Sequence, residues 1–237
     1  MLINTTHRTS ASEIMDDFEL EGEELKDALD KIATINQLLG GNQLTLRGVQ
    51  DLIRKIPKLS EIVLVDVGCG NGDMLRTLAD FGAKNKVKFR LIGIDANNFT
   101  ISHAIKLSEN YSNISYRCEN IFDTPFEALQ YDILLCTLTL HHFKDDEIVY
   151  LLKVFDTNSK MGIVINDLQR SAIAYRLFQV LCFVFRLNKM SREDGLTSIL
   201  RGFKKEELVQ FSKKLNFKNY KIHWKWAFRY QWIISKI

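Results

Sequence analysis

Short, continuous apolar runs alternate along the chain with longer stretches in which apolar residues recur every three or four positions. The short runs cover residues 62–65, 87–94, 114–118, 131–136 and 162–165. The run over 62–65 has no polar alternation, which is typical of a parallel strand that helices cover on both faces. The periodic stretches between them predict amphipathic helices. The pattern therefore predicts an α/β fold with a doubly wound, mainly parallel sheet.

A helical pattern precedes the first predicted strand, over residues 11–56. Gly40 and Gly41 interrupt this pattern and Pro57 ends it, as helix-breaking residues do. The helices either cap a ligand site or pad one face of the sheet, and the sequence favours neither interpretation. The periodic apolar positions are Leu25, Leu29, Ile32, Ile35, Leu38 and Leu39.

Residues 170–187 are too apolar for a surface helix, yet too short and too charged for a membrane span. We predict a lid helix inserted after the fifth strand, with a ligand pocket between this helix and the N-terminal helices. Phe178, Leu181, Phe183 and Phe185 cannot all face the same way, so some should meet the sheet and others a ligand. The polar, glycine-containing residues 191–203 predict a connection to a helix over 204–215, followed by strands over 218–224 and 228–234.

The first predicted strand leads into Asp66 and then into Gly68, Gly70 and Gly72, three glycines at alternate positions. Glycine has no Cβ, so backbone N–H groups of such a loop can approach a bound molecule. The dinucleotide fingerprint G-x-G-x-x-G would need a glycine at position 73, where the chain has Asp73. A strand-end carboxylate such as Asp66 can instead attract an ammonium group, directly or through water.

This loop resembles motif I of the class I S-adenosylmethionine (SAM) methyltransferases. The resemblance implies SAM as the cofactor and S-adenosylhomocysteine (SAH) as the product. Asp95 ends the second strand, where an acid can accept hydrogen bonds from both ribose hydroxyls. The resemblance places the adenine against Asn120 and Ile121, with Asp123 as the alternative to Asn120. The whole implied cofactor site consists of Asp66, Gly68, Cys69, Gly70, Gly72, Asp95, Ala96, Asn120, Ile121 and Cys136.

The fourth predicted strand leads into the pair His141 and His142. This loop lacks the Asp/Asn-Pro-Pro-aromatic motif of amine methyltransferases and the ligand pattern of metal-dependent catechol O-methyltransferases, so we predict no metal site. A histidine of near-neutral pKa can take a proton from a hydroxyl during methylation. Asp167 ends the fifth strand at the same carboxyl edge of the sheet. We predict these three residues as catalytic, although one histidine could instead pack or cap the helix at Asp145.

The histidine pair resembles that of the ubiquinone/menaquinone methyltransferases. Motifs outside the cofactor site resemble the methyltransferases found beside type III polyketide synthases, and the resemblance covers nearly the whole chain. It implies a seven-stranded Rossmann-like sheet whose last strand is antiparallel. A helical cap would cover residues 1–57, and the methyltransferase domain residues 58–237 with a lid insertion over 168–203, as one compact catalytic unit. The acceptor would be a small aromatic or lipophilic molecule of secondary metabolism, with O-methylation favoured. The outer motifs are Glu13 to Asp17, Ile35-Asn36, Asn166 to Leu168 with Arg170, and Arg192 with Asp194-Gly195 before Arg201.

Composition narrows the class further. With 237 residues and 46% hydrophobic content, the chain can bury a sizeable core as one catalytic domain, and its net charge is only +3. Its four cysteines have no C-x-x-C spacing and its first residues no signal-like apolar core, which predicts a reduced, cytoplasmic protein. The sequence leaves the oligomeric state open.

Three other functions compete with this interpretation. An NAD-linked oxidoreductase would need a second catalytic domain, for which the chain has no room. An RNA methyltransferase is suggested by C-terminal lysines interleaved with aromatic residues such as Tyr220 and Trp224, because such residues can follow a phosphate backbone and stack bases. These residues would alternate between the faces of terminal strands, so we expect no nucleic-acid partner. A non-catalytic SAM-binding protein is the third alternative, against which the histidine pair and Asp167 argue.

Overall fold

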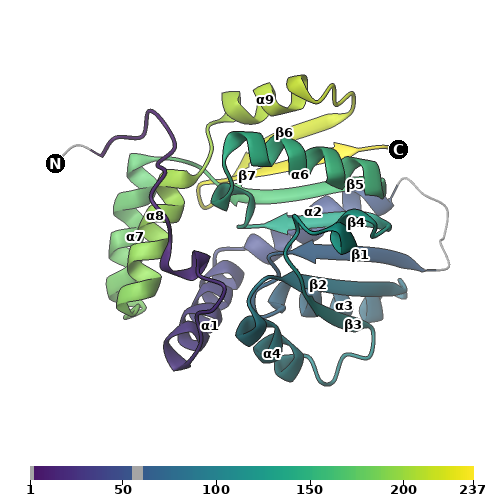
Figure 1. The fold of residues 1–237 in the computed structure, drawn as a ribbon, viewed down its shortest axis with the longest axis horizontal. Helices are drawn as coiled ribbons and strands as arrows, with labels where there is room; N and C mark the ends of the chain where they lie inside the picture. Colours follow the sequence, from purple (N-terminus) through teal and green to yellow (C-terminus); the bar gives the residue numbers. More distant parts are fainter. Residues whose placement is uncertain (1–2, 55–60) are drawn as a thin grey trace.

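A computed structural model describes residues 3–54 and 61–237. Its centre is a seven-stranded sheet of order β3-β2-β1-β4-β5-β7-β6 (Figure 1). The five strands from β3 to β5 are parallel, and β7 is antiparallel to both β5 and β6. The predicted fold class is therefore confirmed, including the antiparallel last strand. The strands are β1 (Ile62–Val67), β2 (Phe89–Asp95), β3 (Ile114–Cys118), β4 (Tyr131–Thr137), β5 (Ser159–Leu168), β6 (Tyr220–Lys225) and β7 (Arg229–Ser235).

Two hydrophobic cores lie on the two faces of this sheet. Alternate residues of β1 enter different cores, since Leu64 belongs to one and Val65 and Val67 to the other. Helices α2 (Gly41–Ile53), α3 (Asp73–Asn85) and α4 (Asn98–Leu107) cover one face. Helices α5 (Thr124–Glu127), α6 (Asp145–Asn158) and α9 (Lys205–Lys214) cover the other, so the central strands are enclosed as their apolar sequences require.

The N-terminal helices divide between the two roles considered for them. Helix α2 packs against β4, β5 and β7 and pads the sheet, whereas α1 (Glu23–Leu38) packs against α2, α4 and the inserted helix α8. Residues 11–20 are not the predicted helix, apart from the short 3-10 helix η1 (Ile14–Asp16). Gly40 ends α1 as predicted, and α2 begins at the next residue. Ile56 and Pro57, predicted to end the second helix, lie outside the described residues.

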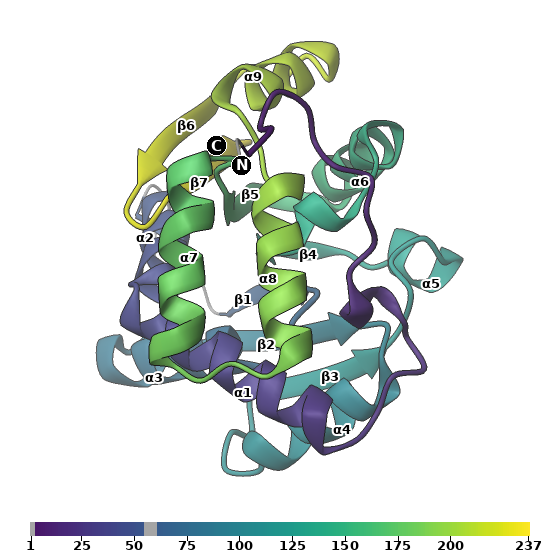
Figure 2. The same cartoon turned by 90° about the vertical axis from the view of Figure 1, so that its left-hand side faces the viewer.

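The segment after β5 forms a pair of helices, α7 (Ala172–Val184) and α8 (Lys189–Arg201), which stand side by side beyond the end of the sheet (Figures 1 and 2). Helix α7 matches the predicted lid. The prediction of a polar connection over residues 191–203 was wrong, because most of these residues belong to helix α8. Within the described residues, no helix has the length and the apolar character needed to cross a membrane.

Candidate functional site

A cavity of about 1280 Å³ opens at the carboxyl ends of the parallel strands. Its floor contains the glycine loop after β1 and residues at the ends of β2, β3 and β4. Its walls come from α1, α7 and α8, together with the N-terminal segment. The cavity therefore lies where the sequence predicted a ligand pocket, between the N-terminal helices and the insertion.

The three glycines of the loop have different surroundings. A Cβ at Gly68 would lie 2.4 Å from Thr139, and a Cβ at Gly72 would lie 2.0 Å from the hydroxyl of Tyr116. At Gly70, which lines the cavity, a Cβ would approach only Leu29, at 3.8 Å, and φ is +53°. Gly68 and Gly72 therefore allow close packing of the loop, while Gly70 keeps the backbone open to the cavity.

Acidic side chains surround this loop. Asp95 lines the cavity and accepts hydrogen bonds from the backbone N–H of Gly70 and of Asn97, both at 3.1 Å. Asp66 is buried below the loop and is not among the residues that line the cavity, and its Oδ1 has no hydrogen-bond partner. Burial raises the pKa of Asp66 well above its ordinary value, and the nearby carboxyl groups of Asp73 and Asp95 raise it further. The loop therefore favours a ligand that brings positive charge.

The residues after β3 also line the cavity. Asn120 and Ile121 lie on its wall, whereas Asp123 lies outside it as the residue that precedes α5. Of the two alternatives, Asn120 thus has the position that the prediction requires. Glu119, which the sequence analysis did not select, also lines the cavity and has a buried Oε2 without a partner. Glu119 directly follows β3, much as Asp95 ends β2, and this position could have identified it from the sequence.

The two cysteines predicted at the cofactor site do not line the cavity with their side chains. Cys136 is fully buried in the core on the α6 side of the sheet, and the next residue, Thr137, lines the cavity instead. Cys69 is also buried, with its thiol 3.8 Å from the carbonyl oxygen of Gly70. Cys136 stays a predicted cofactor residue, but alternation along β4 turns its side chain into the core.

His141 and Asp167 form a buried pair, of which His141 lines the cavity. The Nδ1 atom of His141 lies 2.6 Å from Oδ1 of Asp167, and the backbone N–H of His141 donates to the other carboxylate oxygen at 3.1 Å. Both side chains are about 2% exposed. Burial raises the pKa of Asp167, but the neighbouring His141 outweighs it and lowers the pKa below its ordinary value. Nε2 of His141 is buried without a hydrogen-bond partner.

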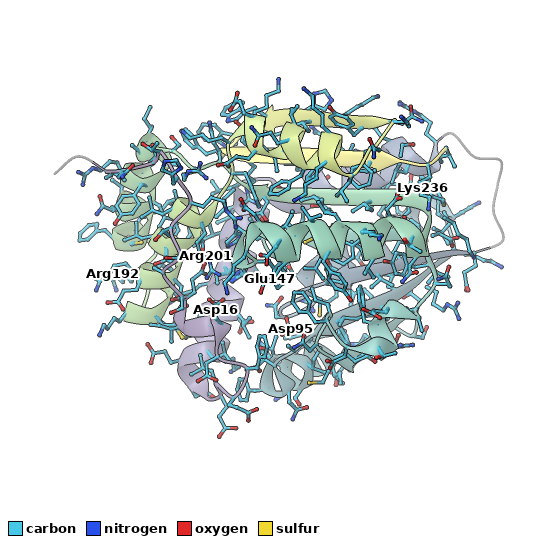
Figure 3. All side chains as sticks on the ribbon, turned by 45° about the horizontal axis from the view of Figure 1, so that its top comes forward. Asp16, Asp95, Glu147, Arg192, Arg201 and Lys236 are labelled. Carbon is cyan, nitrogen blue, oxygen red and sulfur yellow. The ribbon has the colours of Figure 1, made fainter. Side chains whose placement is uncertain are left out.

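His142 has its own carboxylate partner, Asp16, with Nδ1 and Oδ1 2.6 Å apart. Its ring centroid lies 4.3 Å from that of His141. The guanidinium of Arg201 donates to Asp16 at 2.6 Å and to the carbonyl oxygen of His142. Asp16 and Arg201 lie beside each other in Figure 3. Asp145 is the first residue of α6, after Lys144, and its carboxylate pairs with Arg8 at 2.8 Å.

Sequence reasoning missed the contribution of the N-terminal segment to this group. Glu13 lies 3.7 Å from Nε2 of His141 and 3.9 Å from Nε2 of His142, measured to its two carboxylate oxygens. The hydroxyl of Ser198 and the guanidinium of Arg201, both on α8, contact the same carboxylate. The motifs outside the cofactor site include Glu13, Asp16 and Arg201. No pattern in the sequence indicated that these residues contact the histidines.

A comparison with known protein families identifies the family of the chain. A family model described as "Methyltransferase domain" matches residues 58–225. Comparison with curated proteins found no match.

Solved structures resemble the chain over most of its length. The plantazolicin methyltransferase BpumL, in complex with a triazolic desmethylPZN analog and SAH, is 18% identical over 90% of each chain, with a TM-score of 0.65. The magnesium protoporphyrin IX methyltransferase ChlM of Synechocystis PCC 6803, with bound SAH, is 15% identical over 83% of this chain and 82% of that one, with a TM-score of 0.55. A SAM-dependent methyltransferase from Aquifex aeolicus is 13% identical over 92% and 100% of the chains, with a TM-score of 0.61. At these identities the similarity establishes the fold.

Proposed function

The chain belongs to the family of methyltransferase domains and is a class I SAM-dependent methyltransferase, and we propose that it methylates a small, aromatic or lipophilic acceptor on oxygen. The observation that carries this proposal is one cavity that extends from the glycine loop to the paired histidines under an apolar wall. The relatives with known structures, which act on plantazolicin and on magnesium protoporphyrin IX, support a small-molecule acceptor. We expect the enzyme to act in secondary metabolism.

The residues of the loop end fit the cofactor. SAM supplies a methyl group on a positively charged sulfonium and also carries an ammonium group. Asp66, with its unpaired buried oxygen, is proposed to attract that ammonium group, directly or through water. Asp95 would accept hydrogen bonds from the ribose hydroxyls, and Asn120 and Ile121 would receive the adenine.

The acceptor would occupy the part of the cavity between α1 and α7. Leu25 and Leu29 line this part from α1, and Leu177, Phe178 and Leu181 line it from α7. An apolar acceptor gains free energy from burial there, at about 25 cal/mol for each Å² removed from water. Highly charged acceptors would lose their hydration without a compensating partner on these walls.

His141 is proposed to accept the proton of the acceptor hydroxyl. Its Nδ1 is held by Asp167, which fixes the ring and favours a proton on Nδ1, so Nε2 has a free lone pair. His141 lines the cavity and its Nε2 is unpaired. Methyl transfer itself needs mainly alignment of the reactants, but removal of the proton by a general base typically contributes about 10² to 10⁴-fold.

Transfer from labelled SAM to a panel of phenols, quinones and polyketide products tests the proposal. We expect turnover of lipophilic phenols and an increase in their KM of at least about fivefold in Leu181→Ser, which removes an apolar contact. Phe183→Ser is the matched control on the same helix, because Phe183 is 85% exposed and lies outside the cavity. Turnover of only sugar-like, nucleotide or highly charged acceptors would show that the proposed acceptor class is wrong.

A further inference from the structure

We propose that Glu13, His141 and His142 bind a divalent transition-metal ion at the acceptor end of the cavity. The three side chains can each offer one ligand atom, and these atoms all lie within 4.8 Å of one another. Ligands about 2.0 to 2.2 Å from a shared ion lie about 3 to 3.6 Å from each other. Oε1 of Glu13 lies 3.7 Å from Nε2 of His141 and Oε2 lies 3.9 Å from Nε2 of His142, so the side chains have to move closer together to hold an ion.

The unpaired nitrogen of His141 is the second observation. Its Nε2 is buried and has no hydrogen-bond partner, while the side chain is 2% exposed. Buried polar atoms are nearly always paired, and 3.7 Å to Glu13 is too long for a hydrogen bond. An ion between Nε2 and the carboxylate would satisfy both groups.

Both imidazoles are also oriented as metal ligands are. Asp167 holds Nδ1 of His141 and Asp16 holds Nδ1 of His142, each at 2.6 Å. A carboxylate on one ring nitrogen favours the proton there and leaves the lone pair of the other nitrogen free for a metal. The sequence predicted no metal site because the loop after β4 lacks the ligand pattern of metal-dependent catechol O-methyltransferases. Glu13 is far from the histidines along the chain, and only the fold brings the three together.

The donor set indicates the class of ion. Two imidazoles and one carboxylate suit Zn²⁺, Fe²⁺ or Mn²⁺ better than Ca²⁺ or Mg²⁺, which prefer oxygen ligands. All three residues line the cavity, so the remaining coordination positions would face an acceptor. Arg201 contacts Glu13 at 3.4 Å but is also held by Asp16 and the carbonyl oxygen of His142, so it keeps these partners if Glu13 turns toward the ion.

This inference goes beyond the proposed function and changes one part of it, because a metal-bound Nε2 of His141 cannot also accept the proton of the acceptor. The assignment as a methyltransferase does not depend on the ion. If the ion is present, His141 is its ligand, and the ion lowers the pKa of a bound acceptor hydroxyl as it does that of bound water. Metal binding is therefore measured without SAM and without an acceptor. A negative result would then overturn the metal site and leave the methyltransferase assignment unchanged.

The experiment uses the full chain, freed of any purification tag and stripped with a chelator, and titrates it calorimetrically with Zn²⁺ and spectroscopically with Co²⁺. We expect one equivalent of each ion to bind, with a visible Co²⁺ absorption band. Glu13→Gln and His142→Ala should each weaken binding at least tenfold. His103→Gln and Cys118→Ser should bind normally, since His103 pairs with Asp30 elsewhere and the exposed Cys118 thiol is the alternative zinc ligand.

Circular dichroism and thermal melting of each variant show that it is folded before its affinity is compared. Glu13→Gln preserves the shape of a buried side chain and can still accept the hydrogen bond from Ser198, so it keeps the test usable if His142→Ala does not fold. The proposal is overturned if the wild-type protein binds neither ion, or if folded Glu13→Gln binds both as tightly as the wild type.

Discussion

Gly70 is the position where the backbone of the loop faces the cavity without a side chain. A Cβ there has room, so a larger side chain at Gly70 would extend into the space proposed for SAM. We expect Gly70→Val to reduce SAM affinity at least about a hundredfold, because the side chain blocks the approach of the backbone. Isothermal titration calorimetry with SAM and SAH measures this.

The control for Gly70→Val is Gly40→Val, since both glycines have positive φ and open space at Cβ, but Gly40 lies outside the cavity. Both variants should lose some stability from the strained backbone. Only Gly70→Val should lose the cofactor. Equal SAM affinity in the two variants would contradict the assignment of the loop.

Single substitutions of His141 and Asp167 test the proposal that His141 accepts the proton. We expect His141→Ala and Asp167→Asn to lower kcat at least about tenfold, because the first removes the proton acceptor and the second loosens its orientation. SAM affinity should change little, since neither residue is among those proposed to bind SAM. Steady-state kinetics and calorimetry separate the two effects. Full turnover by folded His141→Ala across pH 6 to 9 would show that the acceptor is activated in another way.

At the scale of elements, the contact between α7 and α8 depends on Gly195. A Cβ at Gly195 would lie 2.3 Å from the ring of Phe178, so the two helices approach closely at this point. We expect Gly195→Val to lower the free energy of unfolding by roughly 1 to 3 kcal/mol, as overpacking of a contact does. Denaturant unfolding measures the loss, and Glu193→Val, at an exposed position of the same helix, should change stability much less.

Elements with a simple apolar period could be predicted from the sequence, and those held by polar contacts could not. The third strand was predicted with its observed bounds because its neighbours in sequence are turn residues. Helix α8 was missed because its buried face includes Ser191 and Asp194. Asp194 is buried because it accepts hydrogen bonds from the backbone N–H groups of Ile14 and Met15, at 2.7 and 2.9 Å. A partner so distant in sequence leaves no periodic signal.

The same limit applies to the site. The glycine loop, Asp95 and the strand-end pair His141 and Asp167 were predictable because parallel strands bring their carboxyl ends to one edge. The positions of Glu13 and Asp16 were not, because residues 3–22 contain no regular element except η1 and follow the surface of α8.

At the scale of the whole molecule, Asp16 ties the N-terminal segment to α8 and to the loop after β4. Burial raises its pKa, but hydrogen bonds from His142 and Arg201 lower it below the ordinary value. A carboxylate with a lowered folded-state pKa stabilises the fold above its unfolded pKa of about 4, and this contribution is lost as the pH falls through the folded-state value.

We therefore expect Asp16→Asn to reduce the free energy of unfolding by roughly 1 to 3 kcal/mol at pH 7, the usual effect of breaking hydrogen bonds to charged groups. The difference from the wild type should shrink below pH 4. Urea unfolding at pH 7, 4 and 3 measures it, with Asp17→Asn as the control because Asp17 is exposed. A difference that stays constant down to pH 3 would mean that the charge of Asp16 does not stabilise the fold.

The order of the last strands has a consequence for synthesis of the protein. Strand β7 lies between β5 and β6, so it fills a position inside the sheet although it follows β6 in the chain. While the chain is still on the ribosome, β6 has no neighbour and the edge of β5 is open to pairing with other chains. A nascent chain therefore has to keep β5 from aggregating until residues 229–235 leave the exit tunnel, and a stall before that point leaves an unprotected edge.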